Sequence, residues 1–183
     1  MGTTRIHTVG HSTHEVAEFI EILRAHGIGQ VVDIRTIPRS RHNPQFNGED
    51  LAASLQAAHI GYRRAKELGG LRQSHRDSIN GAWENDSFRG YADYMQTDGF
   101  AAAVEDLLAR AANNDTAIMC AEAVPWRCHR SLVGDALVVR GAEVLHIISG
   151  STAMEHTLTS FAHLEGTAIT YPSPQGNPEA GKP

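Results

Sequence analysis

The sequence has few cysteines and no long apolar run. Its 183 residues include two cysteines, Cys120 and Cys128, whose spacing is not the CxxC pair of a zinc knuckle. A structural disulfide between them is not expected in a reducing cytosol. No apolar run approaches the length of a membrane-spanning helix, and residues 1–5 lead into a strand-like run without the apolar core of a signal peptide. These absences predict a cytoplasmic protein with no membrane partner.

A strong positive charge and internal repeats are also missing. The chain carries 16 Lys and Arg against 21 Asp and Glu, a formal net charge of −5. That balance argues against a surface that coats nucleic acids, although a local basic patch would still allow nucleic-acid binding. The length and the 41% hydrophobic content fit one globular domain. We predict a single domain over residues 1–165 and a disordered, proline-rich tail over residues 166–183.

Short apolar runs alternate along the chain with segments of helical periodicity. Each apolar run is short enough for a buried strand rather than a helix. The alternation predicts an α/β, single-domain, three-layer Rossmann-like fold, with a mainly parallel sheet and helices on both faces. The predicted strands lie at residues 6–9, 31–35, 60–62, 116–120 and 144–148.

Capping residues help to place the predicted helices. Ser12 and Glu15 fit a capping box at the start of a helix that stops at Gly27. Residues 71–90 are polar and weakly periodic, which indicates a long insertion that could cover a site. The remaining predicted helices span residues 49–58, capped by Asn47, then 91–96, 100–111, 128–140 and 151–164, the last capped by Ser151.

The stretch from Met119 to Arg130 concentrates the residue types that support chemistry. It holds both cysteines, His129, Glu122 and two arginines within twelve residues. An apolar run precedes it and an amphipathic segment follows it, which indicates a strand, a loop and the start of a helix. α/β proteins usually bind their ligands at such a junction.

Polar residues also follow the other predicted strands. The carboxyl ends of parallel strands meet at one edge of a sheet, so these residues are expected to form one pocket. The catalytic candidates are Cys120, Glu122, Cys128, His129, His11 and Asp33. The candidates for ligand binding are Ser12, Arg35, Arg39, Arg41, Asn43, Gly69, Gly70, Arg127 and Arg130.

An anionic ligand would explain the arginines among these candidates. Cys128, His129 and Arg130 are predicted to lie at a helix N-terminus, where free N–H groups and the helix dipole favour anions. Arginine side chains add bidentate contacts to phosphate or carboxylate. The sequence therefore predicts a phosphorylated or nucleotide-like ligand, and it identifies no cofactor.

The two cysteines allow several interpretations. A thiolate at a helix start has a lowered pKa and is nucleophilic. The Cys120-to-Arg127 loop is similar to the Cys-to-Arg loop of rhodaneses and protein tyrosine phosphatases, but it has six intervening residues where the phosphatase loop has five. Cys120, Cys128, His129 and His11 could instead hold a metal, although their spacing matches no common zinc pattern. Both cysteines could also be small buried hydrophobic residues.

Several short motifs occur in a fixed order between about residues 6 and 148. The motifs are Gly10-His11-Ser12, Asp33-Ile34-Arg35, Pro38-Arg39-Ser40-Arg41, Asn43-Pro44-Gln45-Phe46, Leu68-Gly69-Gly70, Tyr91-Ala92-Asp93-Tyr94-Met95, Cys120-Ala121-Glu122 and Cys128-His129-Arg130. In content and order they resemble a bacterial family, domain of unknown function 488. The resemblance implies an α/β single domain with a shared polar site, and it implies no activity.

Three functional hypotheses follow from the sequence. In the first, the pocket binds an anionic small molecule or nucleotide and a thiol carries out chemistry on it. In the second, the protein is a binding module without chemistry that recognises a nucleotide or a nucleic-acid end. In the third, a Cys/His site holds a metal. The sequence leaves open whether the protein is an enzyme and how many copies assemble.

Overall fold

The computed structural model describes residues 2–174, which build a six-stranded sheet of order β3-β2-β4-β1-β5-β6. Strands β3, β2, β4, β1 and β5 are parallel to one another, and β6 runs antiparallel to β5. The strands are β1 (Arg5–Gly10), β2 (Gln30–Asp33), β3 (Gly61–Arg64), β4 (Thr116–Cys120), β5 (Glu143–Ser149) and β6 (Thr152–Glu155).

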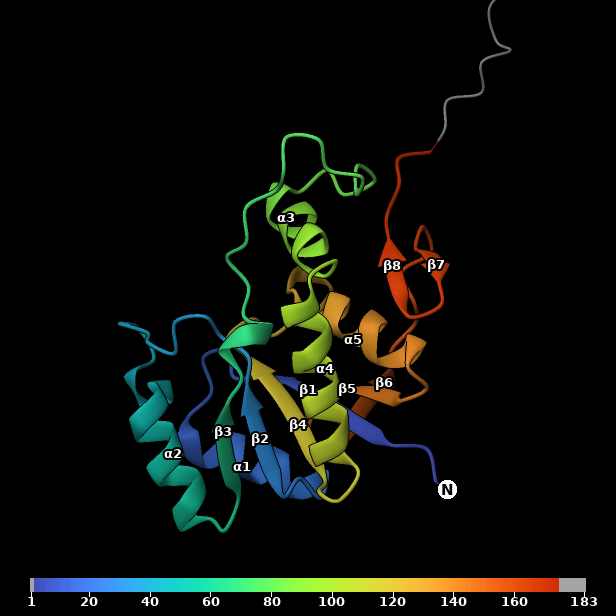
Figure 1. Ribbon diagram of the computed structural model, residues 1–183. Helices are drawn as coiled ribbons and strands as arrows, with labels where there is room; N and C mark the ends of the chain where they lie inside the picture. The colour runs from blue at the N-terminus through green and yellow to red at the C-terminus, as the bar shows by residue number, and fades with distance from the viewer. Residues whose placement is uncertain (1, 175–183) are drawn as a thin grey trace, which may run out of the picture.

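Helices cover both faces of the sheet, which confirms the predicted three-layer α/β fold (Figure 1). One face packs against α1 and α2, and the other packs against α4 and α5. Helix α3 stands beyond the carboxyl ends of the strands (Figure 1). The helices are α1 (Val16–Ala25), α2 (Gly48–Ala57), α3 (Asp86–Tyr94), α4 (Asp98–Ala111) and α5 (Arg130–Val139). Within residues 2–174, none of the helices is long and apolar enough to cross a membrane.

The central strand β4 shows why apolar runs predicted the strands. All five of its residues are buried, because helices cover it on both sides. Its side chains alternate, so Ala117 and Met119 pack towards α1 and α2 while Ile118 and Cys120 pack towards α4 and α5. The alternation places Cys120 in the same core cluster as Cys128.

The ends of β1 and β4 come unusually close to the loop that follows β4. Gly10 pairs with Cys120, and a Cβ atom on Gly10 would lie 1.9 Å from the carbonyl oxygen of Glu122. Only glycine therefore fits at this point of the β1 strand end. The pairing continues beyond the strands, where the His11 and Ser12 N–H groups donate to the carbonyls of Cys120 and Ala121.

This extended pairing explains why the predicted capping box is wrong. Ser12 lies in a turn with φ of 49°. Glu15 is the N-cap residue of α1, and its side chain makes no capping hydrogen bond. Asn47 does precede α2, but its Oδ1 atom accepts a hydrogen bond from the N–H of Ser40, 2.9 Å away, instead of capping the helix.

The predicted helix over residues 151–164 is also wrong. Residues 152–155 form β6, which pairs with the exposed edge of β5. A hairpin of β7 (His163–Glu165) and β8 (Ala168–Thr170) follows. Backbone pairing with a sheet edge is a tertiary interaction, and it outweighs the weak local preference for a helix.

The hairpin also corrects the predicted disordered tail for residues 166–174. Tyr171, directly after β8, is fully buried, and its hydroxyl donates to Asp135. Residues 175–183 of the predicted tail lie outside the described residues.

The predicted insertion 71–90 contains a long loop that leads into α3. The helix begins earlier than predicted, at Asp86, because Asn85 caps it by accepting from the N–H groups of Ser87 and Phe88. The loop is fixed by the Asp93 carboxylate, which accepts from the His75 N–H and the Asn80 amide. Leu71, Ser87 and Phe88 from this region line the pocket described below.

Candidate functional site

A pocket of about 340 Å³ lies at the carboxyl edge of the sheet, between the β4–α5 loop and the region of residues 70–91. Both cysteines, His129 and Arg127 line it from the β4–α5 segment. Leu71, Phe88 and Tyr91 contribute apolar and aromatic surface. The full lining is Arg35, Thr36, Ile37, Gly70, Leu71, Ser87, Phe88, Tyr91, Cys120, Ala121, Glu122, Arg127, Cys128 and His129.

The two cysteine sulfurs are in direct contact. Their Sγ atoms lie 2.7 Å apart, and both cysteines are free. Cys120 ends β4, and Cys128 follows a short 3-10 helix (Pro125–Arg127), two residues before α5 begins. The connecting loop folds back because the Arg130 guanidinium donates to the carbonyls of Glu122 and Ala123.

The Cys128 sulfur lies among polar groups. The Cys120 sulfur is 2.7 Å from it, the His129 Nδ1 atom is 3.5 Å away, and the Arg130 N–H donates to it from 3.4 Å. The hydrogen bond from Cys120, together with His129 and the nearby Arg130 charge, lowers the pKa of Cys128 to about 4. Burial and the neighbouring Cys128 raise the pKa of Cys120 well above its usual value. The contacts with His129 and the Arg130 N–H therefore favour the thiolate on Cys128 rather than on Cys120.

His129 is held between this sulfur and the sheet. Its Nε2 atom lies 3.2 Å from the carbonyl oxygen of Ile34, so this nitrogen carries a proton and donates it there. Its Nδ1 atom then faces Cys128. Gly70 makes room for the ring, since a Cβ atom there would lie 3.1 Å from His129 Nδ1. The Tyr91 hydroxyl supports the same segment by donating to the carbonyl of Leu68.

Arg130 places a positive charge beneath the pocket. Its side chain is fully buried, and among residues 2–174 no carboxylate forms an ion pair with it. Its Nε atom has no hydrogen-bond partner among the described residues. A buried cation without a carboxylate favours a nearby anion, and the guanidinium lowers the pKa of Cys128.

Asp33, Arg35 and His11 form a second polar cluster behind the pocket. The Asp33 carboxylate is fully buried and accepts from the Arg35 guanidinium through both oxygens. It also accepts from the hydroxyl of Tyr62, 2.7 Å away. Arg35 additionally donates to the carbonyl of Phe46. These residues therefore neutralise one another.

His11 completes this cluster as a neutral ring. Arg35 can only donate, so the His11 Nε2 atom, 3.2 Å from Arg35 Nη1, accepts. The His11 Nδ1 atom then donates to the carbonyl of Ser12, 2.8 Å away. Burial lowers the pKa of His11 to about 4. Neither His11 nor Asp33 lines the pocket, although both were predicted as catalytic candidates.

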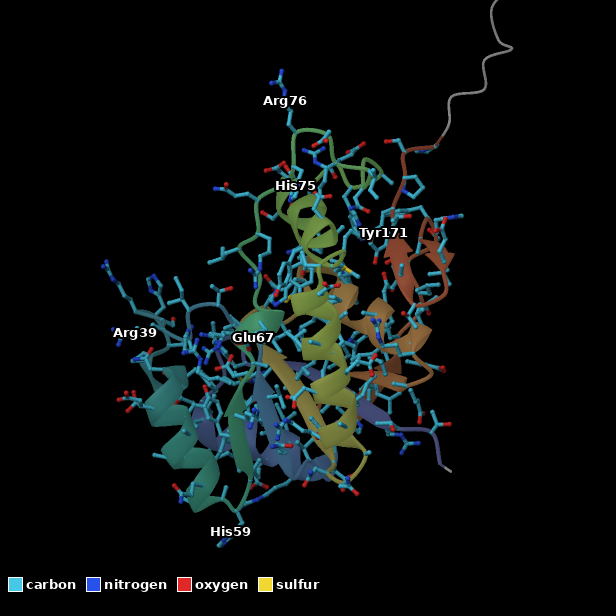
Figure 2. The ribbon with its side chains drawn as sticks, in the orientation of Figure 1. Arg39, His59, Glu67, His75, Arg76 and Tyr171 are labelled. Carbon is cyan, nitrogen blue, oxygen red and sulfur yellow. The ribbon has the colours of Figure 1, made fainter. Side chains whose placement is uncertain are left out.

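The structure brings some of the predicted ligand-binding residues to the pocket and leaves others outside it. Arg35, Gly70 and Arg127 line it, whereas Arg130 is fully buried and does not. Arg39 and Arg41 are exposed on the loop before α2, and Figure 2 shows Arg39 extending away from the sheet edge. Ser12, Asn43 and Gly69 are likewise absent from the lining. The sequence predicted five arginines around the ligand, but two of them, Arg35 and Arg127, line the pocket.

Sequence reasoning missed the apolar part of the pocket. Ile37, Leu71 and Tyr91 were not among the predicted site residues, yet all three line it. The predicted insertion over residues 71–90 was the sequence feature that could have identified them. A segment expected to cover a site also contributes side chains to the wall of that site.

A metal site finds no support in the geometry. Within residues 2–174, no group of three or more His, Cys, Asp or Glu side chains gathers in a way that could hold a metal ion. His11, one of the suggested ligands, faces Arg35 rather than the cysteines.

Comparisons with known proteins add a family but no activity. No curated protein and no solved structure matches the chain. A family model described as domain of unknown function DUF488 matches residues 15–137, which include the Asp33–Arg35 pair and both cysteines. Because this match covers more than half of the sequence, the chain belongs to the DUF488 family.

Proposed function

We propose that the pocket binds a small anionic ligand with an apolar part and that the Cys128 thiolate reacts with it. The observation that carries this proposal is the environment of the Cys128 sulfur. Cys128 lines the pocket, and its sulfur accepts a hydrogen bond from the Arg130 N–H and lies beside the Cys120 sulfur and His129. A buried thiolate stabilised in this way is the usual arrangement of a reactive cysteine rather than of a structural one.

The lining suggests the class of ligand. A volume of about 340 Å³ suits a small molecule. Ile37, Leu71 and Phe88 offer contacts for a flat or apolar body, while Arg127 and the start of α5 offer positive charge for an anionic group. Glu122 also lines the pocket and limits the net positive charge there. These features fit a phosphorylated or nucleotide-like ligand better than a bare inorganic anion.

The same residues supply the parts of a nucleophilic reaction. The Cys128 sulfur would form a bond to an electrophilic atom of the ligand as a leaving group departs. The His129 Nδ1 atom faces the reacting sulfur, and when the ring is protonated on both nitrogens it would donate its Nδ1 proton to that leaving group, because the Nε2 proton is held by Ile34. Asp33, Arg35 and His11 act in this proposal only as the rigid support of the pocket floor.

The thiolate is tested by measuring the rate of alkylation by iodoacetamide against pH. We expect a single labelled site, Cys128, and a rate that is nearly constant above about pH 5.5, because the pKa of Cys128 is about 4. Cys128→Ser should abolish the labelling. A rate that climbs tenfold per pH unit between pH 7 and 8.5 would show an ordinary thiol and would contradict the proposal.

Ligand binding is tested by protection of Cys128 against the same reagent. Pyrophosphate and adenosine monophosphate are suitable probes, and adenosine monophosphate should protect better because it also has a flat body. Arg127→Ala should weaken protection about tenfold, as expected for the loss of one charge-assisted hydrogen bond. Arg76→Ala is the matched control, because Arg76 points away from the protein at the far end of the insertion (Figure 2). Equal protection in both variants would contradict the proposed site.

A further inference from the structure

The contact between the two sulfurs carries an inference beyond nucleophilic chemistry. Their separation of 2.7 Å is less than 1 Å longer than a disulfide bond of about 2.05 Å. Both sulfurs line the same pocket, so a ligand that reaches one lies beside the other. Such a contact places the second cysteine where it can attack the sulfur of the first and displace a group bonded to that sulfur.

The two cysteines differ in ways that assign them different roles. Cys128 lies beside the start of α5 and contacts His129 and the Arg130 N–H. Cys120 is 3% exposed at the end of β4, and its one other hydrogen-bond contact within residues 2–174 is with the carbonyl of Glu122, 3.8 Å from the sulfur. The first cysteine has the surroundings of an attacking thiolate, and the second has those of a protected thiol.

We propose that Cys120 and Cys128 form a redox-active pair that exchanges with a small organic disulfide bound in the pocket. Cys128 attacks the ligand, and Cys120 is the resolving cysteine. The inference rests on the proposed function, because it requires the reactive Cys128. It takes the anionic ligand to be a disulfide in place of a phosphorylated compound, and it adds the fate of the covalent intermediate.

The reaction balances in two steps. The Cys128 thiolate attacks one sulfur of R–S–S–R′, so a Cys128–S–R bond forms, the ligand S–S bond breaks and R′S⁻ leaves. Cys120 then loses its proton to R′S⁻ and attacks the Cys128 sulfur. The Cys120–Cys128 bond forms, the bond to R breaks and RS⁻ leaves. The cysteines are oxidised by two electrons and the ligand is reduced to two thiols; an external dithiol returns the pair to its starting state.

The surroundings of the pair favour its reduced form. Arg130 is fully buried without a carboxylate among the described residues, and the Cys128 thiolate is the anion near it. Disulfide formation would remove that negative charge and leave the guanidinium uncompensated. A pair whose reduced form is stabilised in this way is a weak reductant, so its complete oxidation needs the disulfide, here oxidised glutathione, in large excess over the thiol.

The test uses the full chain incubated with oxidised glutathione, a small anionic disulfide, followed by acid quenching and intact mass measurement. We expect the wild-type protein to lose two hydrogens and to release two glutathione thiols per chain. Cys120→Ser should instead accumulate one glutathione attached to Cys128. Cys128→Ser should gain nothing, because Cys120 is buried and its pKa is raised well above the ordinary value.

Two results would overturn the inference. One is a wild-type protein that stops at the mixed disulfide, and the other is a disulfide that links two chains on a non-reducing gel. Either result, combined with rapid alkylation of Cys128, would leave the proposed function standing while removing the resolving role of Cys120. Slow alkylation of Cys128 would remove both.

A second measurement concerns the balance between the two redox states. His129→Gln should remove a group that stabilises the Cys128 thiolate, so the disulfide form should persist at a higher ratio of reduced to oxidised glutathione. The loss of one hydrogen bond of this kind corresponds to a shift of about tenfold in that equilibrium. An unchanged ratio would contradict the role assigned to the thiolate environment.

Discussion

Two buried polar clusters lie side by side at the carboxyl edge of the sheet, and they differ in how completely their charges are satisfied. In the first, Asp33 and Arg35 form an ion pair that Tyr62 and His11 complete. In the second, Arg130 is buried without a carboxylate among the described residues, and the Cys128 sulfur faces the pocket. A satisfied network holds the chain in place, whereas an incomplete one leaves charge available to a ligand.

The difference follows from where each cluster lies along the chain. Asp33 ends β2, and Arg35 follows two residues later, so their pairing is local and needs little help from the rest of the fold. Cys120 and Cys128 are in contact because the β4–α5 loop folds back, and a hydrogen bond from Arg130 to the Glu122 carbonyl stabilises that loop. The first cluster is therefore a local ion pair, whereas the second is formed by segments that the tertiary fold brings together.

The largest expected effect comes from breaking the satisfied cluster. Asp33→Asn would leave the Arg35 cation buried without its partner, so we expect the free energy of unfolding to fall by about 3–5 kcal/mol. Urea unfolding measures this change. Asp106→Asn is the matched control, because Asp106 pairs with Arg110 on the exposed surface of α4 and should cost less than about 1 kcal/mol. Equal losses in both variants would contradict the contrast between the clusters.

A smaller effect is expected in a third buried network, which ties the C-terminal hairpin to the fold. Asp135 accepts from His156 and from the Tyr171 hydroxyl. Tyr171→Phe removes one hydrogen bond to a buried carboxylate and should lower the free energy of unfolding by about 1.5–3 kcal/mol. Cys128 alkylation should be unchanged, since Tyr171 does not line the pocket. A large change in that rate would show that the networks are coupled.

The dependence of stability on pH sharpens the comparison further. The folded state holds the pKa of His11 near 4, below its ordinary value, so the unfolded chain binds a proton first as the pH falls. Stability from this residue is therefore present above about pH 6.5 and is lost between pH 6.5 and 4. His11→Gln should reduce the slope by up to about 1.4 kcal/mol per pH unit.

The control for this experiment is His42→Gln, a substitution on the exposed loop before α2. It should leave the slope of stability against pH as it is in the wild-type protein. His146, whose pKa burial also lowers to about 4, would maintain part of the slope in both variants. A slope that His11→Gln does not change would show that His11 is not held neutral.

The layered fold was predictable because its signals are local. Buried strands such as β4 appear as short apolar runs, and α4 shows the spacing of an amphipathic helix. The predicted helix over residues 151–164 failed for the opposite reason. Whether that segment forms a helix or an edge strand depends on the free edge of β5, which no local pattern encodes.

The candidate site was predictable only in outline. The strand ends pointed to the carboxyl edge of the sheet, and Cys120, Cys128, His129 and Arg127 line one pocket there. The prediction that the arginines after β2 bind the ligand has no such support. Arg35 is held by Asp33, and Arg39 and Arg41 extend into solvent, because side-chain partners and loop direction are set by three-dimensional packing.

The sequence by itself determined the alternation of strands and helices and the edge at which the polar residues gather, because periodicity and strand order are properties of the chain. Only the tertiary structure decided which of those residues neutralise one another and which face the pocket. The contact between Cys120 and Cys128 is the clearest case. Their sulfurs are in contact because the β4–α5 loop folds back and Arg130 stabilises it. The distance between these segments is not specified by the order of residues in the sequence.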